Sequence, residues 1–272
     1  MIAHPVLLPT ASGAQGAVVT VPDGPPVAAA VVLQAFGSTR AGTNQTYVRL
    51  AEGLADLGVV TLRFDYPTFG ESHALDLSSG LDASTELLAW FRARTEGLDL
   101  LVYAYCFGVA PAAMLSRTEE RLAGVAIVTP PMIRTNADGW ERRREPLPSR
   151  AWRRVRRLRR LPYRLVIRLA YGTPDSPTYT EADEDSGEWN PDGMLRELVD
   201  AAPVWVLVGE LDLSTPVLRE LEPELSPSGR FELEVVDGLV MYRYRTQEAQ
   251  DAFVERSLAW AARCLAPAAA VS

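Results

Sequence analysis

The sequence predicts an α/β fold: a mostly parallel central sheet with helices on both faces and one inserted helical segment. Short, continuously apolar runs alternate with helical patterns along the chain, which is typical of buried parallel strands. A strongly charged block interrupts this alternation once. The length of 272 residues with 47% apolar content suffices for one large core. We therefore expect a core from residues 1–130 and 201–272, and an inserted lid at 131–200.

The elements of the core follow from the residue pattern in chain order. The first thirty residues, with VLLP and GAVVTVP, predict an antiparallel hairpin at one edge of the sheet. β-rich runs predict the strands 28–36, 58–66, 98–105, 125–130, 203–210 and 230–238. Helical spacing predicts the helices 46–58, 82–97, 112–124 and 246–266.

The inserted block reads as two oppositely charged halves. An Arg-rich stretch, RRREPLPSRAWRRVRRLRRL, is followed by the acidic stretch EADEDSGEWNPD. The halves either pair loosely as solvated faces, or the Arg-rich half guides an anionic substrate or an acidic carrier protein. The lid also carries aromatic residues that suit a bulky substrate or its own small core (Trp140, Trp152, Tyr163 and Trp189).

Composition narrows the functional classes. The formal charge of −8 argues against nucleic acid as a partner, and no apolar run is long enough for a transmembrane helix. Cys106 and Cys264 make no disulfide framework and no secretory signal is evident, so we expect a cytoplasmic protein. No ligand spacing predicts a metal, and no glycine-rich loop predicts a nucleotide cofactor. All 27 basic residues are Arg, which we attribute to a compositional bias of the genome or lineage and not to function.

Cys106 stands where a predicted strand turns directly into a helix, in the stretch LLVYAYCFGVAPAAML. A nucleophile on such a turn has small residues two positions before and after it, here Ala104 and Gly108. The helix N-terminus would favour a thiolate. The alternative is a cysteine that serves as a small buried apolar residue.

These motifs together resemble the α/β-hydrolase superfamily, in particular its serine-aminopeptidase-like branch. LQAFGSTRAG (33–42) stands at the oxyanion loop, FDYPTFGES (64–72) matches the Asp-x-x-Gly-x-Gly-x-Ser turn with Thr68 for the first Gly, and LVGELDLSTP (207–216) carries the acid of the triad. The resemblance implies Cys106 as nucleophile and Asp212 as acid. It implies oxyanion donors at the backbone of Phe107 and of Ala35 or Phe36.

The chain departs from the resemblance at the base. The segment VVDGLVMYRYRTQEA, where the histidine of the triad is expected, contains none; Met241 or Val240 takes its place, with Tyr242 and Tyr244 nearby. We expect Met241 and Tyr242 to contribute to substrate binding. His73, after the FDYPTFGES turn, is either a displaced base or a loop residue with local contacts. Asp212 without a histidine can act as acid or base, bind a substrate hydroxyl, or cap its turn.

Three functions remain open from the sequence. The favoured one is an enzyme of secondary metabolism that eliminates a carboxylate from, or cyclises, an acylated polyketide-like ester or thioester, free or on a carrier protein. The fold's natural-product members, as the resemblance implies, include such lyases and cyclases. The second is a Cys-dependent esterase or thioesterase with His73 as base. The third is a catalytically inactive protein that binds an acyl ligand or a partner.

Overall fold

The computed structural model describes residues 1–10, 13–34, 38–66, 72–74, 78–132 and 190–266. The chain divides into two compact units, Met1–Met132 with Pro191–Ser272, and Ile133–Asn190. Nearly all of the second unit, and with it most of the predicted lid, lies outside the described residues. Residues 191–200, which we assigned to the end of the lid, form a helix that packs within the first unit.

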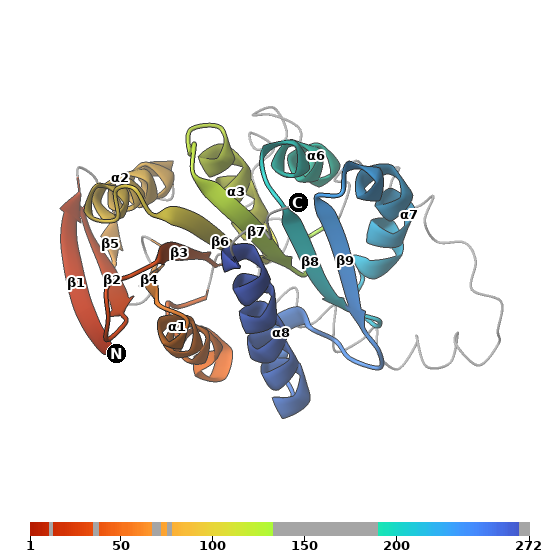
Figure 1. Ribbon diagram of the computed structural model, residues 1–272, viewed down its shortest axis with the longest axis horizontal. Coiled ribbons are helices and arrows are strands. Elements are labelled where there is room, and N and C mark those ends of the chain that lie inside the picture. Colours follow the sequence, from red (N-terminus) through yellow and green to blue (C-terminus); the bar gives the residue numbers. More distant parts are fainter. Residues whose placement is uncertain (11–12, 35–37, 67–71, 75–77, 133–189, 267–272) are drawn as a thin grey trace, which may run out of the picture. The chain divides into compact units, whose positions relative to one another are not determined.

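A single sheet with the order β1-β2-β4-β3-β6-β7-β8-β9 forms the centre of the first unit (Figure 1). All pairs from β4 to β9 are parallel, while β1 and β2 are antiparallel to their neighbours. The short β5 pairs with β2 outside this order. The strands are β1 Ile2–Thr10, β2 Gly13–Val21, β3 Ala28–Leu33, β4 Val59–Phe64, β5 His73–Ala74, β6 Asp99–Tyr105, β7 Leu122–Val128, β8 Val204–Gly209 and β9 Phe231–Val236.

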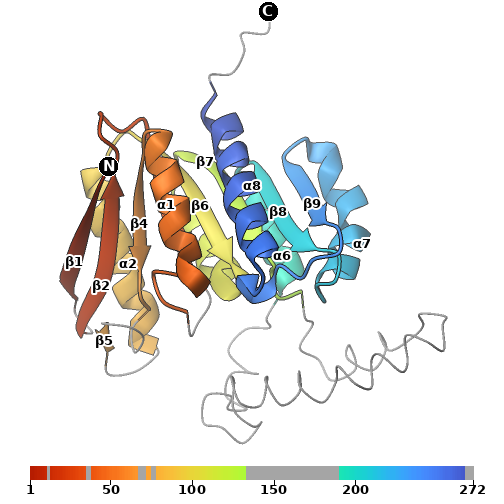
Figure 2. The same ribbon diagram turned by 90° about the horizontal axis from the view of Figure 1, so that it is seen from below.

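Helices cover both faces of the sheet, as predicted. α1 and α8 lie side by side on one face, and α2, α3, α6 and α7 lie on the other (Figures 1 and 2). The helices are α1 Thr46–Asp56, α2 Ser78–Arg94, α3 Val109–Ser116, α6 Pro191–Ala201, α7 Thr215–Leu225 and α8 Gln247–Leu265. No helix in the described ranges is both long and apolar enough to cross a membrane.

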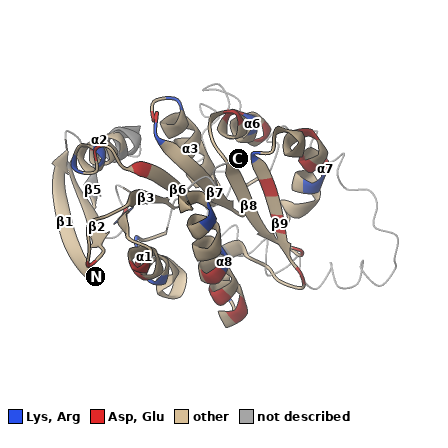
Figure 3. Cartoon of the chain, in the orientation of Figure 1, with Lys and Arg blue, Asp and Glu red and all other residues tan. Residues whose placement is uncertain are grey.

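The central strands bury both of their faces, which explains their continuous apolar sequences. β3, β7 and β8 carry no charged residue, whereas β9 and the helices other than α3 do (Figure 3). Every residue of β3, β4 and β8 is buried. Such strands are stable only with a helix layer on each side, and this arrangement brings the ends of β6, β7 and β8 together at one edge.

The predicted edge hairpin is present. β1 pairs with β2 over its whole length, from Ile2 opposite Val21 to Thr10 opposite Gly13, and includes Pro5 and Pro9. β1 is the outer strand of the sheet and most of its residues are exposed.

The predicted helix 112–124 is wrong in its second half. α3 ends at Ser116, and Leu122–Val128 forms β7, which pairs with β6. The charged residues between them have the spacing of a helix, but the segment is not helical, and Glu119 binds Arg92 of α2 instead. A long-range contact therefore overrides the local preference of this segment.

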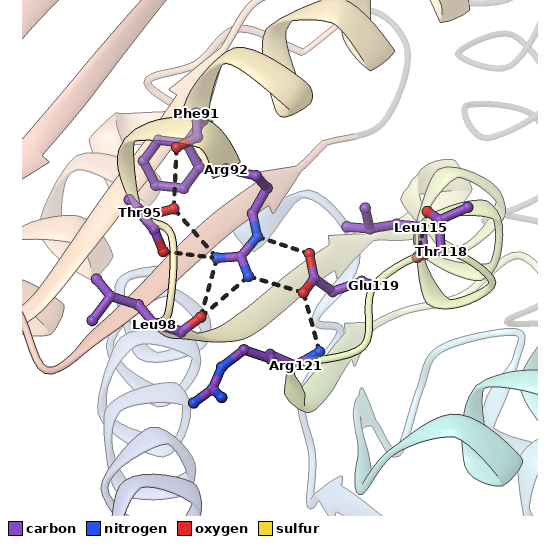
Figure 4. Close-up of polar contacts among 8 residues, drawn as sticks. All are labelled: Phe91, Arg92, Thr95, Leu98, Leu115, Thr118, Glu119 and Arg121. Carbon is purple, nitrogen blue, oxygen red and sulfur yellow. Dashed lines mark hydrogen bonds and ion pairs between the residues drawn. The ribbon is translucent and has the colours of Figure 1, made fainter.

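Arg92 fixes the start of β6, the strand that leads to Cys106 (Figure 4). Its guanidinium forms a two-bond contact with Glu119, with Nε to Oε2 at 2.7 Å and Nη2 to Oε1 at 2.9 Å. It also donates to the carbonyl oxygens of Leu98 at 3.2 Å and Thr95 at 3.4 Å. The contacts join the end of α2, the turn before β6 and the turn before β7.

Replacing Arg92 by Leu should lower the free energy of unfolding by about 2–3 kcal/mol, because the half-buried Glu119 and two carbonyls lose a charged donor. Urea denaturation followed by circular dichroism measures the change. Arg94→Leu is the matched control: Arg94 is an exposed residue of the same helix that lies over the half-buried ring of Trp90, and its loss should cost less than about 1 kcal/mol. Equal losses in the two variants would contradict this role for Arg92.

Candidate active site

Cys106 lies at a sharp turn between β6 and α3, as the sequence predicts. Tyr105 is still extended, with φ −108°, whereas Cys106 has φ 52°, a backbone conformation that side chains other than glycine rarely adopt. Residues 106–108 form a single 3-10 turn that leads directly into α3. The side chain of Cys106 is 3% exposed. Strained conformations of this kind concentrate at functional sites.

The close approach of the turn after β6 to the end of β3 requires a glycine at position 108. A Cβ atom on Gly108 would stand 2.1 Å from the carbonyl oxygen of Leu33, which is far inside contact distance. Ala104 is buried and pairs with Leu33 of β3 and Ile127 of β7. The turn is thus held against the end of β3, with the half-buried Phe107 next to Cys106.

Aromatic side chains surround this end of β6. Tyr105, Tyr244 and Tyr47 contact one another through their rings: the centroids lie 5.1 Å apart for Tyr105–Tyr244, 6.3 Å for Tyr47–Tyr105 and 6.5 Å for Tyr47–Tyr244. Cys106 and Met241, which is fully buried, belong to the same core cluster. Cys106 therefore lies among apolar and phenolic groups contributed by β6, α1 and the loop before α8.

Asp212 connects two loops through backbone contacts. One carboxylate oxygen accepts hydrogen bonds from the backbone N–H groups of Gly209 at 2.7 Å and Met241 at 3.1 Å, and the other accepts one from Tyr242 at 3.1 Å. Gly209 ends β8, and Met241 and Tyr242 lie in the loop after β9. The carboxylate thus binds the backbone of the loop in which a triad histidine was expected.

Burial and hydrogen bonding act in opposite directions on this carboxyl group. Desolvation raises the pKa of Asp212 above its ordinary value, and the N–H groups of Gly209, Tyr242 and Met241 counteract the rise. The sequence led us to expect a raised pKa in an apolar turn. The contacts agree with the alternative in which Asp212 caps its own turn, and Asp212 also binds the loop after β9.

The other predicted site residues are only partly described. The backbone of His73 lies in β5, opposite Ala14 of β2, so that β4 and β3 separate its partner strand from β6. Its side chain lies outside the described residues, as do Ala35 and Phe36. The roles of His73, Ala35 and Phe36 therefore stay predictions.

The FDYPTFGES motif fixes the loop after β3 through residues that sequence reasoning left without a role. The fully buried Asp65 accepts a hydrogen bond from the backbone N–H of Arg40 at 2.5 Å and pairs with its guanidinium. Ser72 donates to the carbonyl of Asp65 and accepts from the N–H of Gly16, both at 2.9 Å. The motif thus holds together β2, β4 and the loop after β3, a structural function.

Two further residues near Cys106 received no role from the sequence. Thr129, which follows β7, has φ 46°, and Tyr244, in the 3-10 turn Tyr242–Tyr244, has φ 43°. Both are buried. Tyr244 was visible in the sequence as a neighbour of the missing histidine, but nothing in the sequence indicated that its ring turns inward.

The comparisons with known proteins agree with this architecture. No protein-family model matches the chain, and the comparison with curated proteins gave no match. Among solved structures, a carboxyl esterase from Bacillus coagulans has a TM-score of 0.65 at 11% identity, covering 97% of this chain and 99% of the other. An esterase from Pyrococcus furiosus has a TM-score of 0.65 at 14% identity, covering 97% and 91%.

A third structure, an alpha-beta serine hydrolase homologue from Coxiella burnetii, has a TM-score of 0.58 at 15% identity, covering 94% of this chain and 96% of the other. At these identities the likeness concerns the fold. The strand order, the turn at Cys106 and the structural neighbours agree: this chain has the α/β-hydrolase fold.

Proposed function

We propose that the protein is an enzyme that acts on an ester or thioester, with the thiol of Cys106 as its nucleophile. The observation that supports this most directly is the strained backbone at Cys106, held at the start of α3 by the approach of Gly108 to Leu33. The helix N-terminus favours the anion that forms there. Proteins named as esterases share the fold.

The surroundings of Asp212 favour transfer of the acyl group over its hydrolysis. Hydrolysis through an acyl-enzyme needs a base that activates water. Residues 237–246 contain no histidine, and the carboxylate of Asp212 binds the backbone of that loop instead. An acyl group on Cys106 would then pass to a nucleophile within the substrate itself, which closes a ring. The alternative reaction, elimination of a carboxylate from the substrate, would proceed without a covalent acyl-enzyme.

The covalent route is balanced without a further reactant. The Cys106 thiolate attacks the carbonyl carbon, a C–S bond forms and the bond to the leaving alkoxide or thiolate breaks. An internal hydroxyl or amine then attacks the thioester, the C–S bond breaks and the thiolate is regenerated. The proton that this hydroxyl or amine loses balances the proton that the released alkoxide or thiolate takes up. The substrate we propose is an acylated, polyketide-like compound, free or bound to a carrier protein.

Hydrolysis is the second candidate, because the similar solved structures from Bacillus coagulans and Pyrococcus furiosus are esterases. In that case His73 would supply the base. The two candidates differ in the lifetime of the acyl-enzyme in water: it is long for a cyclase that lacks a base for water, and short for a hydrolase.

Intact-protein mass spectrometry after incubation with p-nitrophenyl butyrate tests the proposal. We expect one butyryl group on the wild-type protein, stable in buffer, and none on Cys106→Ala. Cys264→Ala is the matched control and should be acylated like the wild type, because burial raises the pKa of Cys264 to about 11.

Rapid turnover that His73→Ala abolishes would favour the hydrolase. A wild-type protein that is neither acylated nor active on esters would contradict a nucleophilic Cys106. Thermal stabilisation by acyl ligands would then indicate a catalytically inactive protein that binds an acyl ligand.

A further inference from the structure

Three residues other than glycine with positive φ gather around the end of β6. Cys106 and Thr129 follow directly on Tyr105 and Val128, which are paired in the β6–β7 register, so the two residues lie on neighbouring strands. Tyr244 packs its ring on Tyr105, with the centroids 5.1 Å apart. For β-branched and aromatic residues such conformations are rare, and they persist where the surrounding structure enforces them.

The hydroxyl of Tyr244 is buried without a protein partner. The residue is 1% exposed, and within the described part of the chain its oxygen has no hydrogen-bond partner. The ring is fixed on three sides, by Tyr105, by Tyr47 at 6.5 Å and by Phe253 at 4.5 Å. A buried hydroxyl that lacks a partner costs free energy, so a ligand atom that accepts its proton would be bound favourably.

The electrostatic surroundings keep this phenol protonated at neutral pH. Burial, first, and then Tyr47, Tyr105, Cys106 and Asp212 raise the pKa of Tyr244 well above its ordinary value. These four groups come from α1, β6, the turn after β6 and the turn after β8. The hydroxyl is therefore a hydrogen-bond donor, and its anion, once formed, is a strong base.

We propose that Tyr244 is a catalytic residue that donates its proton to the leaving oxygen of an ester attacked by Cys106. This inference rests on the proposed function and narrows the substrate to oxygen esters with a basic leaving group. In the first half of the reaction the thiolate forms the C–S bond, the C–O bond breaks and the alkoxide takes the phenolic proton. In the second half the tyrosinate takes the proton of the substrate's internal hydroxyl or amine as that group displaces the thiolate. Tyr244 thereby serves both halves in place of an imidazole.

A series of butyrate esters with increasingly basic leaving groups tests the role: p-nitrophenyl, phenyl, trifluoroethyl and ethyl. The rate of acylation of Cys106 is measured by intact mass for the wild type and Tyr244→Phe. For the p-nitrophenyl ester, whose anion leaves without a proton, we expect the rates to agree within about twofold, because general acid catalysis helps only basic leaving groups. For the ethyl ester we expect Tyr244→Phe to be slower by about 10²-fold or more.

Two measurements separate a catalytic from a structural role. Tyr244→Phe should unfold at the wild-type urea concentration, because it removes only an unpartnered oxygen. Tyr103→Phe is the matched control, since the buried Tyr103 hydroxyl donates to the carbonyl of Ser257 at 3.2 Å; it should lose about 1 kcal/mol of stability and keep the wild-type dependence on the leaving group.

The same dependence of rate on leaving-group basicity in Tyr244→Phe and wild type would overturn the role of Tyr244, while acylation of Cys106 would stand. A uniform loss of rate with all four esters would overturn it as well, because it would indicate altered packing. If no ester acylates the wild-type protein, the proposed function fails and this inference with it.

Discussion

Gly108→Ala is expected to be among the most destabilising single-methyl additions in the core unit. The added Cβ would meet the carbonyl oxygen of Leu33 at 2.1 Å and its carbonyl carbon at 3.0 Å, and both are backbone atoms of a central strand. Neither can move by rotation of a side chain, so the turn 106–108 and the end of β3 must separate. We expect a loss of about 3 kcal/mol or more, measured by urea denaturation.

Gly24→Ala is the matched control for this substitution. No atom lies within 4 Å of the Cβ that it would add, and Gly24 has no positive φ. Its free energy of unfolding should stay within about 0.5 kcal/mol of the wild type. If Gly108→Ala were equally harmless, the approach of the turn to β3 would not be a constraint on the position of Cys106.

Asp212→Ala is expected to have the second large effect on stability. It leaves the buried N–H groups of Gly209 and Met241, and the half-buried N–H group of Tyr242, without their common acceptor. At about 1–3 kcal/mol for each buried group that stays unsatisfied, the loss should be about 3 kcal/mol or more. Asp212→Asn keeps one acceptor oxygen but turns an amide donor towards an N–H group, so we expect a smaller loss of about 1–2 kcal/mol.

The control for Asp212 comes from the same pair of loops. Glu210 accepts a hydrogen bond from the N–H of Gly238 at 2.9 Å, but at an exposed position where water can replace it. Glu210→Ala should therefore cost less than about 0.5 kcal/mol. A similar loss in Glu210→Ala and Asp212→Ala would show that the three backbone contacts of Asp212 do not stabilise the fold more than an exposed contact does.

The pH dependence of stability shows which influence on Asp212 dominates. Because burial raises its folded-state pKa above the unfolded value, the folded protein holds the proton more strongly. This contribution is complete below the unfolded pKa and is lost as the pH rises through the folded pKa. The advantage of the wild type over Asp212→Asn, which cannot titrate, should thus shrink as the pH rises through this window. A growing advantage would mean that the three N–H groups outweigh burial.

The parts of the fold that depend on local sequence were predictable. The β-rich, largely apolar runs of β3, β4, β6 and β8 identify buried strands, and the turn at Cys106 follows from residues 104–108 alone. The boundary between α3 and β7 was not, because Leu122 and Gly124 pair with β6 and Glu119 is held by Arg92 from another helix. Contacts of that range leave no local pattern.

The candidate site was likewise predictable only in those parts that depend on local sequence. Cys106 and Asp212 were found from motifs, but two of the three partners of Asp212 are backbone N–H groups 29 and 30 positions away, and a backbone donor has no residue type to recognise. Tyr244 meets Tyr47 of α1 and Tyr105 of β6 only after the whole sheet has formed. The sequence could show that the loop after β9 lacks a histidine, but not that the ring of Tyr244 packs against those of Tyr47 and Tyr105.

The two prolines of β1 have a consequence for how copies of the protein meet. Pro5 and Pro9 are four positions apart, so both direct their backbone nitrogen to the same side of the strand. The register with β2 runs unbroken past them, which assigns that side to the outer edge. An incoming strand would find two of the hydrogen-bond donors missing there. The open end of the sheet is therefore a poor template for strand addition, and this protects a long, exposed β-strand from aggregation.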